Sequence, residues 1–341
     1  MNNPPKVQKI LNLLIQLAIF ASTYLFIYHQ VFQKGDIPGL LVSLENFMAE
    51  PGFKNGLLLV GLMMIVNWSL EALKWKYLIG KVEVVSFFNA FQAVLTGISV
   101  SSVIPNRVGE FFGRIYILKT ASRIEGILIT LVGSMSQLLI TVIAGSAAML
   151  IFIRNYLPDS GFSHGYLFNS LAVIIVTLDI ILVSLFFRVS ILAALKERIL
   201  KNGLKRWQKY LGVFAFYHNR ELAAVVLLSL TRYLVFSTQF YILLRLFHIS
   251  IPYPDALLLI SLVYFIMAMI PTIALTELGI RGSVALYIFG IYFGQGLTPG
   301  GSNSIGVLAA STLLWLINLG IPALIGTVFV FRLKFFRKSA G

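Results

Sequence analysis

The sequence predicts an all-α, polytopic membrane protein, and three observations lead to this fold class. The 341 residues are 58% hydrophobic and only 12% charged, whereas about a quarter of the residues of a soluble domain are charged. Apolar runs long enough to cross a bilayer recur along the chain. Charged residues fall mostly between these runs, as they do at the ends of spanning helices. We expect one integral membrane domain, residues 1–341, with about six to eight spanning helices and one or two re-entrant helical hairpins.

The basic composition indicates lipid rather than nucleic acid. The formal net charge is +14, but the basic residues flank apolar runs, where they set membrane topology and contact anionic lipid. The chain has no cysteine, which excludes disulfides and thiol chemistry. Its four histidines are far apart and lack the spacing of metal ligands. We therefore expect no metal, no cofactor and no nucleic-acid partner.

The first two spans follow from charge and hydropathy. A basic N-terminus precedes an apolar run from Ile10 to Phe32, which is too long for a signal peptide and predicts a retained first span. The next loop has more acidic than basic residues and is expected outside. The second span, Leu57 to Leu73, ends at a group of lysines that should lie inside.

A re-entrant hairpin is predicted next. Val84 to Asn106 contains no charged residue and ends at Pro105, which disfavours a helical conformation at the residue before it. A short helix from Arg107 to Lys119 follows. Because basic residues at both ends place them inside, this segment should enter the bilayer and return to the same side.

Two further spans and a basic segment complete the first half. Gly126 to Ile153 should run outward, and Tyr166 to Phe187 should return. Residues 188–220 hold eight Lys or Arg against one Glu and favour an amphipathic helix on the anionic cytoplasmic leaflet, a solvated basic loop being the alternative. This linker joins two halves, approximately residues 1–187 and 221–341.

The second half resembles the first in outline. Leu222 to Phe247 should span outward. The segment from Ala256 to Phe293 allows two full spans or a second re-entrant hairpin. A last uncharged run, interrupted by turn-forming residues at 298–303, leads to a basic tail. Both termini are therefore expected in the cytoplasm, and the protein in the cytoplasmic membrane.

Two charged motifs beside proline-containing apolar runs are the candidate functional sites, because charge at membrane depth is costly. A shift of 170 residues places Arg107 and Gly109 on Glu277 and Gly279, which predicts an inverted repeat. In the first motif Arg107, Glu110 and Arg114 share one helix face. Gly109 and Gly113 form a small-xxx-small pair that lets a backbone approach, and Pro105 and Asn106 shape the break before them.

The second motif has the signature of a helix start. Thr276 is the expected N-cap, Glu277 complements the helix dipole, and Arg281 stands four residues later, where a local pair can form.

Two interpretations of these charges remain open. The motifs can neutralise each other, Arg107 with Glu277 and Glu110 with Arg281, to lock the bundle. Alternatively, three arginines against two glutamates leave one positive charge for a lipid phosphate. Asp179 and Arg232, charges within predicted spans, are secondary candidates that either pair with each other or line the path.

The first motif resembles a signature of a known family. The pattern of Pro105, Arg107, Gly109, Glu110 and Arg114 is similar to that of the lysylphosphatidylglycerol synthase transmembrane region, also called the flippase-like family. Gly279 and Arg281 resemble its second signature. This chain departs from that signature at Glu277 and Gly282.

The resemblance implies a lipid flippase without the soluble synthase domain that follows this region in the full-length enzymes. It would move an anionic, aminoacylated or polyprenyl-linked lipid between leaflets, with no catalytic residue. Alternatives are a membrane-embedded lipid-modifying transferase, with Glu110 as base, and a structural partner in an envelope-building complex. Expected partners are membrane phospholipid or polyprenyl lipid, the anionic leaflet through 188–220, and a second copy in a homodimer.

Overall fold

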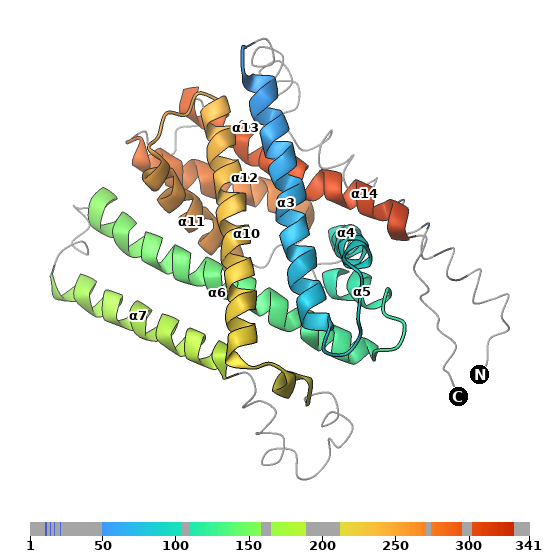
Figure 1. Cartoon of the computed structure of the whole chain (residues 1–341). Coiled ribbons are helices and arrows are strands. Elements are labelled where there is room, and N and C mark those ends of the chain that lie inside the picture. The colour runs from blue at the N-terminus through green and yellow to red at the C-terminus, as the bar shows by residue number, and fades with distance from the viewer. Residues whose placement is uncertain are drawn as a thin grey trace.

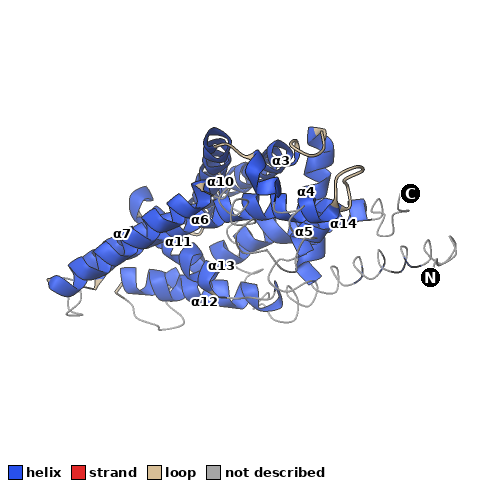
Figure 2. Ribbon diagram, turned by 90° about the horizontal axis from the view of Figure 1, so that it is seen from below, coloured by secondary structure: helices blue, strands red, loops and turns tan. Residues whose placement is uncertain are grey.

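The computed structural model describes residues 50–103, 109–157, 165–188, 212–270, 274–294 and 302–330, together with Leu11, Leu14, Leu17 and Ala21 (Figure 1). Helices make up nearly all of these residues, and the described part of the chain contains no strand (Figure 2). Five of its helices are long and apolar enough to cross a membrane. The predicted fold class, an all-α polytopic membrane protein, is confirmed.

Most of the predicted spans are recognisable among the helices. The last span runs from Asn303 to Val330 and contains a π-helical turn. The elements are α3 (Phe53–Ile79), α4 (Phe87–Val103), α5 (Gly109–Ile115), α6 (Arg123–Tyr156), α7 (Tyr166–Phe187), a 3-10 turn (Gly212–Phe216), α10 (Asn219–Leu246), α11 (Tyr253–Met269), α12 (Ala274–Tyr292), α13 (Ser302–Trp315), the π-helical turn (Leu316–Gly320) and α14 (Ile321–Val330).

Two spans begin earlier than hydropathy predicts because a glutamate caps them. The backbone N–H of Ser122 donates to the Glu125 carboxylate at 3.3 Å, and that of His218 to Glu221 at 3.0 Å. A glutamate at the third helical position that binds the N-cap backbone is half of a capping box. The polar residues expected as loop therefore form the first turns of α6 and α10.

The two halves repeat each other in element length and order. Helix α10 begins 166 residues after α3, and α11 begins 166 residues after α4. The first pair has 27 and 28 residues, and both members of the second have 17. Helices α3 and α10 lie side by side at the centre, while α4 packs on α14 and α11 packs on α6 (Figure 1). Each short helix thus packs on a helix of the other half.

Glycine lets both of these crossings close tightly. A Cβ added at Gly326 of α14 would collide with the Leu95 carbonyl oxygen and the Ser99 hydroxyl of α4, and one added at Gly145 of α6 would collide with the Phe265 side chain of α11. The contact at Ser99 is also polar, since its hydroxyl donates to the Ala323 carbonyl oxygen at 2.6 Å. Small residues at helix crossings are typical of membrane bundles.

Each of the two short helices ends two residues before a proline in the sequence and packs against the next helix. Helix α4 packs on α5, and α11 packs on α12. Seventeen helical residues extend about 25 Å, less than the roughly 30 Å of a bilayer core. The re-entrant course of the first hairpin, and the choice between two full spans and a second hairpin for residues 256–293, stay predictions.

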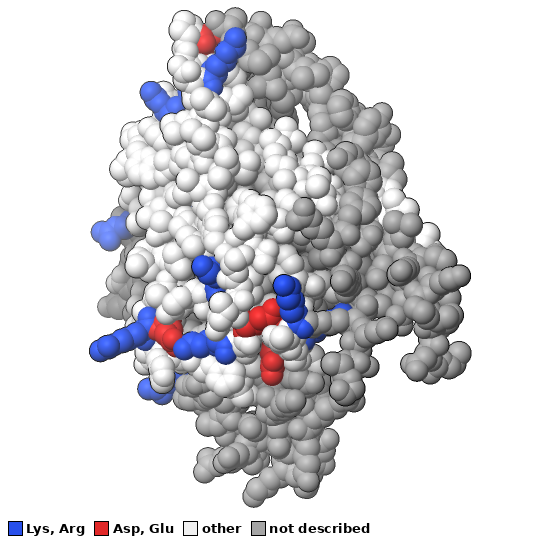
Figure 3. All heavy atoms as spheres, turned by 45° about the vertical axis from the view of Figure 1, so that its right-hand side comes forward, with Lys and Arg blue, Asp and Glu red and all other residues white. Residues whose placement is uncertain are grey.

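One face of the bundle has a wide apolar zone (Figure 3). On the face shown in Figure 3, most charged side chains gather near one end and a few at the other, with a wide uncharged zone between them. Helix α7 is the most exposed span: Phe186 is its single buried side chain, and it packs on α6. Exposed leucine and isoleucine on such a helix suit lipid rather than water. The predicted first span, most of the linker 188–220 and the basic tail lie outside the described residues.

Candidate functional site

The first motif builds a tightly packed hairpin. Gly109 and Gly113 are buried, and a Cβ at Gly113 would collide with the backbone of Gly97 on α4. A Cβ at Gly109 would collide with the backbone of Ser101, one turn further along α4. The small-xxx-small pair therefore brings α5 against α4, as its spacing predicts.

This packing buries Arg114 beside a carboxylate from another helix. Arg114 is 1% exposed, and its Nη1 donates to Oε1 of Glu71 on α3 at 2.9 Å. Its Nη2 donates to Oε2 of Glu110, one turn earlier on α5, at 3.1 Å. Arg114 thus fastens the hairpin to α3 through charge-assisted hydrogen bonds.

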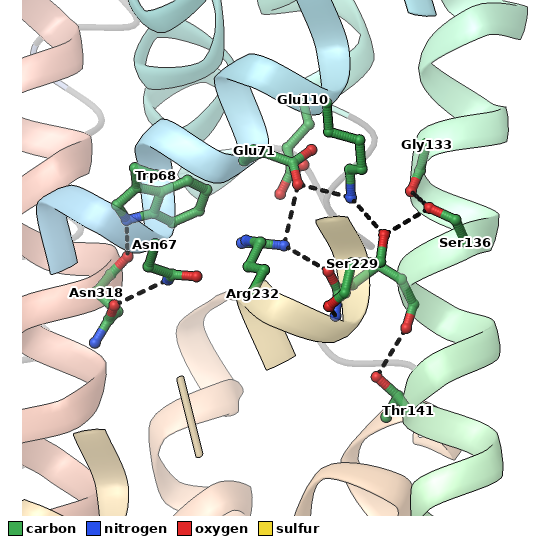
Figure 4. Close-up of polar contacts among 12 residues, drawn as sticks. Asn67, Trp68, Glu71, Glu110, Gly133, Ser136, Thr141, Ser229, Arg232 and Asn318 are labelled. Atoms are coloured by element: carbon green, nitrogen blue, oxygen red, sulfur yellow. Dashed lines mark hydrogen bonds and ion pairs between the residues drawn. The ribbon is translucent and has the colours of Figure 1, made fainter. Parts of the chain in front are cut away.

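Glu71 is the centre of a larger ion cluster. Its Oε2 lies 2.8 Å from Lys74 Nζ and 3.2 Å from Nη1 of Arg232 on α10 (Figure 4). Lys74 also donates to the hydroxyl of Ser229 at 3.3 Å. Three cations therefore meet two carboxylates, Glu71 and Glu110, in the interior. Such a cluster is tolerated at membrane depth because each charge has partners.

Arg232 lies halfway along α10 and has two further contacts. Its Nη1 donates to the side-chain oxygen of Gln137 on α6 at 3.3 Å. Its guanidinium carbon lies 4.9 Å from the ring centroid of Trp68, which is a cation–π distance. The indole N–H of Trp68 donates to the Asn318 carbonyl oxygen at 3.1 Å, which fixes the ring (Figure 4).

The second motif forms a local ion pair. Helix α12 begins at Ala274, so Thr276 lies in its first turn and not at the expected N-cap. Nη2 of Arg281 donates to Oε1 of Glu277 at 2.7 Å. Both side chains are buried, and among the described residues Nε of Arg281 has no hydrogen-bond partner.

A cavity of about 720 Å³ joins the second motif to the ion cluster. Its polar wall includes Arg232, Arg281, Glu277 and Asn67, and the side-chain oxygen of Asn67 has no hydrogen-bond partner in the described part of the chain. Apart from Gln137, Thr141 and Asn318, the rest of the wall is apolar or aromatic. Its other lining residues are Trp68, Gln137, Thr141, Tyr233, Phe236, Tyr264, Met267, Ala268, Met269, Ile270, Leu314, Trp315, Asn318 and Leu319.

The structure separates the predicted motif residues into two groups. Glu277 and Arg281 line the cavity together with the secondary candidate Arg232, whereas Glu110 and Arg114 belong to the ion cluster behind it. Arg107, Pro105 and Asn106 lie outside the described residues. Gly279 is exposed with open space around it, so it has no packing role like that of Gly109.

Two predicted pairings are wrong. Glu110 pairs with Arg114 and not with Arg281, because a partner four residues away on the same helix is closer than one on another hairpin. Asp179 does not pair with Arg232 either: it accepts a hydrogen bond from Ser146 at 2.6 Å, while Arg232 binds Glu71. Asp179 also does not line the cavity.

The sequence interpretation missed Glu71. This residue was placed inside the second span without being recognised as a charge at membrane depth. The signal was present, since Glu71 is the single acidic residue of that predicted span and Lys74 follows at a distance of three. The cavity residues Asn67 and Asn318 were missed too, and no spacing in the sequence marks them.

Comparison with known proteins gives one result. A family model described as the lysylphosphatidylglycerol synthase TM region matches residues 13–321. None of the curated proteins and none of the solved structures compared with the chain matches it.

Proposed function

Because the chain belongs to the family of the lysylphosphatidylglycerol synthase TM region, we propose that it moves an anionic lipid between membrane leaflets, with the headgroup in the cavity of α3, α10 and α12. The observation that carries the proposal is a cavity at mid-span lined by two arginines. Arg232 lies near the middle of α10, and a charged residue at that depth is a functional candidate even where it has a counter-charge.

The chemistry of the wall fits a phosphate diester. Guanidinium groups bind phosphate oxygens through paired N–H donors, and Arg232 and Arg281 both line the cavity. Asn67 and Thr141, polar residues of the same wall, suit a hydroxyl or ammonium group of the headgroup. Glu277, held by Arg281, adds a negative charge that suits an aminoacylated headgroup.

The size and the apolar wall fit a headgroup whose chains stay in the bilayer. Ligand pockets of about 300–1,000 Å³ enclose drug-sized molecules, so the cavity holds a headgroup but not two acyl chains. Phe236, Tyr264 and Met269 provide an apolar side along which glycerol and the first methylenes can lie. Both termini lie in the cytoplasm in this proposal, and the chain sits in the cytoplasmic membrane.

The experiment is leaflet exchange in proteoliposomes. The purified protein should accelerate exchange of labelled phosphatidylglycerol over protein-free vesicles and act much less on labelled phosphatidylcholine. Mass spectrometry of the recovered lipid should show it chemically unchanged. Equal exchange in both vesicle types would contradict the proposal, and a new lipid product would favour the transferase alternative.

A further inference from the structure

The two oxygens of Glu71 hold different partners. Oε1 accepts from Arg114 at 2.9 Å, and Oε2 is shared between Lys74 at 2.8 Å and Arg232 at 3.2 Å. Of these three cations, Arg232 is the one that lines the cavity. Glu71 therefore joins the buried hairpin to the wall of the cavity through a single guanidinium group.

Arg232 is the least tightly held of the three cations: its side chain is 19% exposed, against 2% for Lys74 and for Arg114, and its contact with Glu71 is the longest. If it turns away, Oε1 keeps Arg114 and Oε2 keeps Lys74, so the carboxylate retains two positive partners. The other contacts of Arg232, with Gln137 and Trp68, are with residues that line the cavity. The guanidinium of Arg232 thus contacts the Glu71 carboxylate and also lines the cavity in which a ligand would lie.

We infer that Glu71 is an internal anion that competes with a ligand's phosphate for Arg232. This inference rests on the proposed function and makes Glu71 a positioning residue, since it acts on the ligand through Arg232. The shared chemistry is a phosphate oxyanion, which a lipid headgroup or free phosphate can supply.

The competition explains how a partly buried arginine can both bind and release an anion. Three cations and two carboxylates leave the cluster with one positive charge, which one phosphate neutralises. In a low dielectric, an arginine with no competing carboxylate would hold that phosphate tightly. Glu71 weakens the bound state by offering Arg232 a second partner, so that the headgroup can leave toward either leaflet.

The test measures binding and exchange together for Glu71→Gln. Binding of labelled phosphatidylglycerol to the full chain in uncharged detergent should become at least about tenfold tighter, because a competing charge is removed. Leaflet exchange of the same lipid should slow by at least about tenfold, because release is impaired. A purely structural role for Glu71 would weaken binding or leave it unchanged.

Two further variants keep the outcome interpretable. If Glu71→Gln does not fold, the double variant Glu71→Gln/Lys74→Gln takes its place. It removes one charge of each sign and should show the same gain in affinity for the lipid. Glu71→Gln in an Arg232→Gln background should show no gain, since the effect acts through that arginine.

The outcomes separate the two proposals. If Arg232→Gln weakens binding but neither Glu71 variant tightens it, the competition is refuted and the headgroup cavity stands. If Arg232→Gln binds as the parental protein does, the cavity itself is refuted. Inorganic phosphate, added as a competitor of the labelled lipid, identifies the source of the oxyanion. If phosphate displaces the lipid more effectively from Glu71→Gln than from the parental protein, Arg232 binds free phosphate. If only the affinity for the lipid rises, Arg232 binds the phosphate of a lipid headgroup.

Discussion

Arg114 and Glu71 are 43 residues apart in sequence and meet at 2.9 Å in the interior. The pair fastens the first hairpin to α3, because Arg114 belongs to α5 and both side chains are almost completely buried. Arg114 donates one hydrogen bond to each of two carboxylates, Glu71 and Glu110, and so holds the hairpin in one position against α3.

We predict that Arg114→Gln destabilises the protein by about 3 kcal/mol, because the carboxylates of Glu71 and Glu110 lose a positively charged partner in the interior. Arg123→Gln is the control, because Arg123 lies at the start of α6, 4.8 Å over the ring of Tyr116. It should cost about 1 kcal/mol or less. Thermal unfolding in detergent measures both, and equal midpoints for the two variants would refute the fastening role of Arg114.

Gly113→Ala should open the first hairpin, because the added methyl group collides with the backbone of Gly97. Overpacking of this kind costs about 1–3 kcal/mol. Gly279→Ala is the matched control in the other motif, where an added Cβ meets nothing within 4 Å. It should be neutral or stabilise helix α12 by up to about 1 kcal/mol. Similar losses in both variants would show that the two glycines have the same role.

Glu83 should make stability depend on pH at one end of the bundle. Its carboxylate accepts hydrogen bonds from the backbone N–H groups of Lys119, Thr120 and Ala121 at 2.7–3.0 Å. Burial acts to raise the pKa of Glu83, but these hydrogen bonds outweigh it and lower the pKa below its ordinary value. The stabilisation is therefore present above the unfolded pKa of about 4.3 and is lost as pH falls through the lower, folded pKa.

Glu83→Gln should accordingly cost about 1 kcal/mol at neutral pH, a modest loss because the carboxylate is partly solvated. The unfolding midpoints of variant and parent should converge once the pH lies below the folded pKa. The difference in unfolding midpoint between the two proteins reports on Glu83 alone, because the other carboxylates titrate in both. A constant difference down to that pH would show that its charge does not contribute.

The ends of α6 should be accessible from opposite sides of the membrane. Lys119 and Arg154 are exposed and lie near the two ends of this 34-residue helix. Because the native chain has no cysteine, Lys119→Cys and Arg154→Cys each provide a single label. We expect Arg154→Cys to react from outside intact cells and Lys119→Cys only after permeabilisation. The reverse pattern would invert the topology.

Hydropathy and charge were sufficient to predict the spans but not their partners. The run from Tyr166 to Phe187 is helix α7 as predicted, because its ends coincide with turns and its length matches a bilayer. The hairpin near Pro105 was predicted because a charge-free run that ends at a proline has basic residues on both sides, which places both ends inside. Cap residues such as Glu125 extended the helices beyond the apolar runs.

The site was predicted in part. Glu277 and Arg281 line the cavity, and Arg232 does too, although it ranked below them. Which helix supplies each counter-charge depends on the packing of distant segments, so Glu71 could not be assigned to Arg114 and Arg232 from spacing alone. The local pairs within α5 and α12 follow the i, i+4 spacing, which a sequence does show.

The most direct test of the central claim is leaflet exchange of labelled phosphatidylglycerol by Arg232→Gln and Arg281→Gln. Arg245→Gln is the matched control, since Arg245 is exposed on the same helix as Arg232 and bonds Ser250 at 3.1 Å. We expect both cavity variants to lose at least about tenfold in rate while remaining monodisperse, Arg281→Lys to be intermediate, and Arg245→Gln to match the parental rate. Folded cavity variants that exchange the lipid at the parental rate would contradict the account.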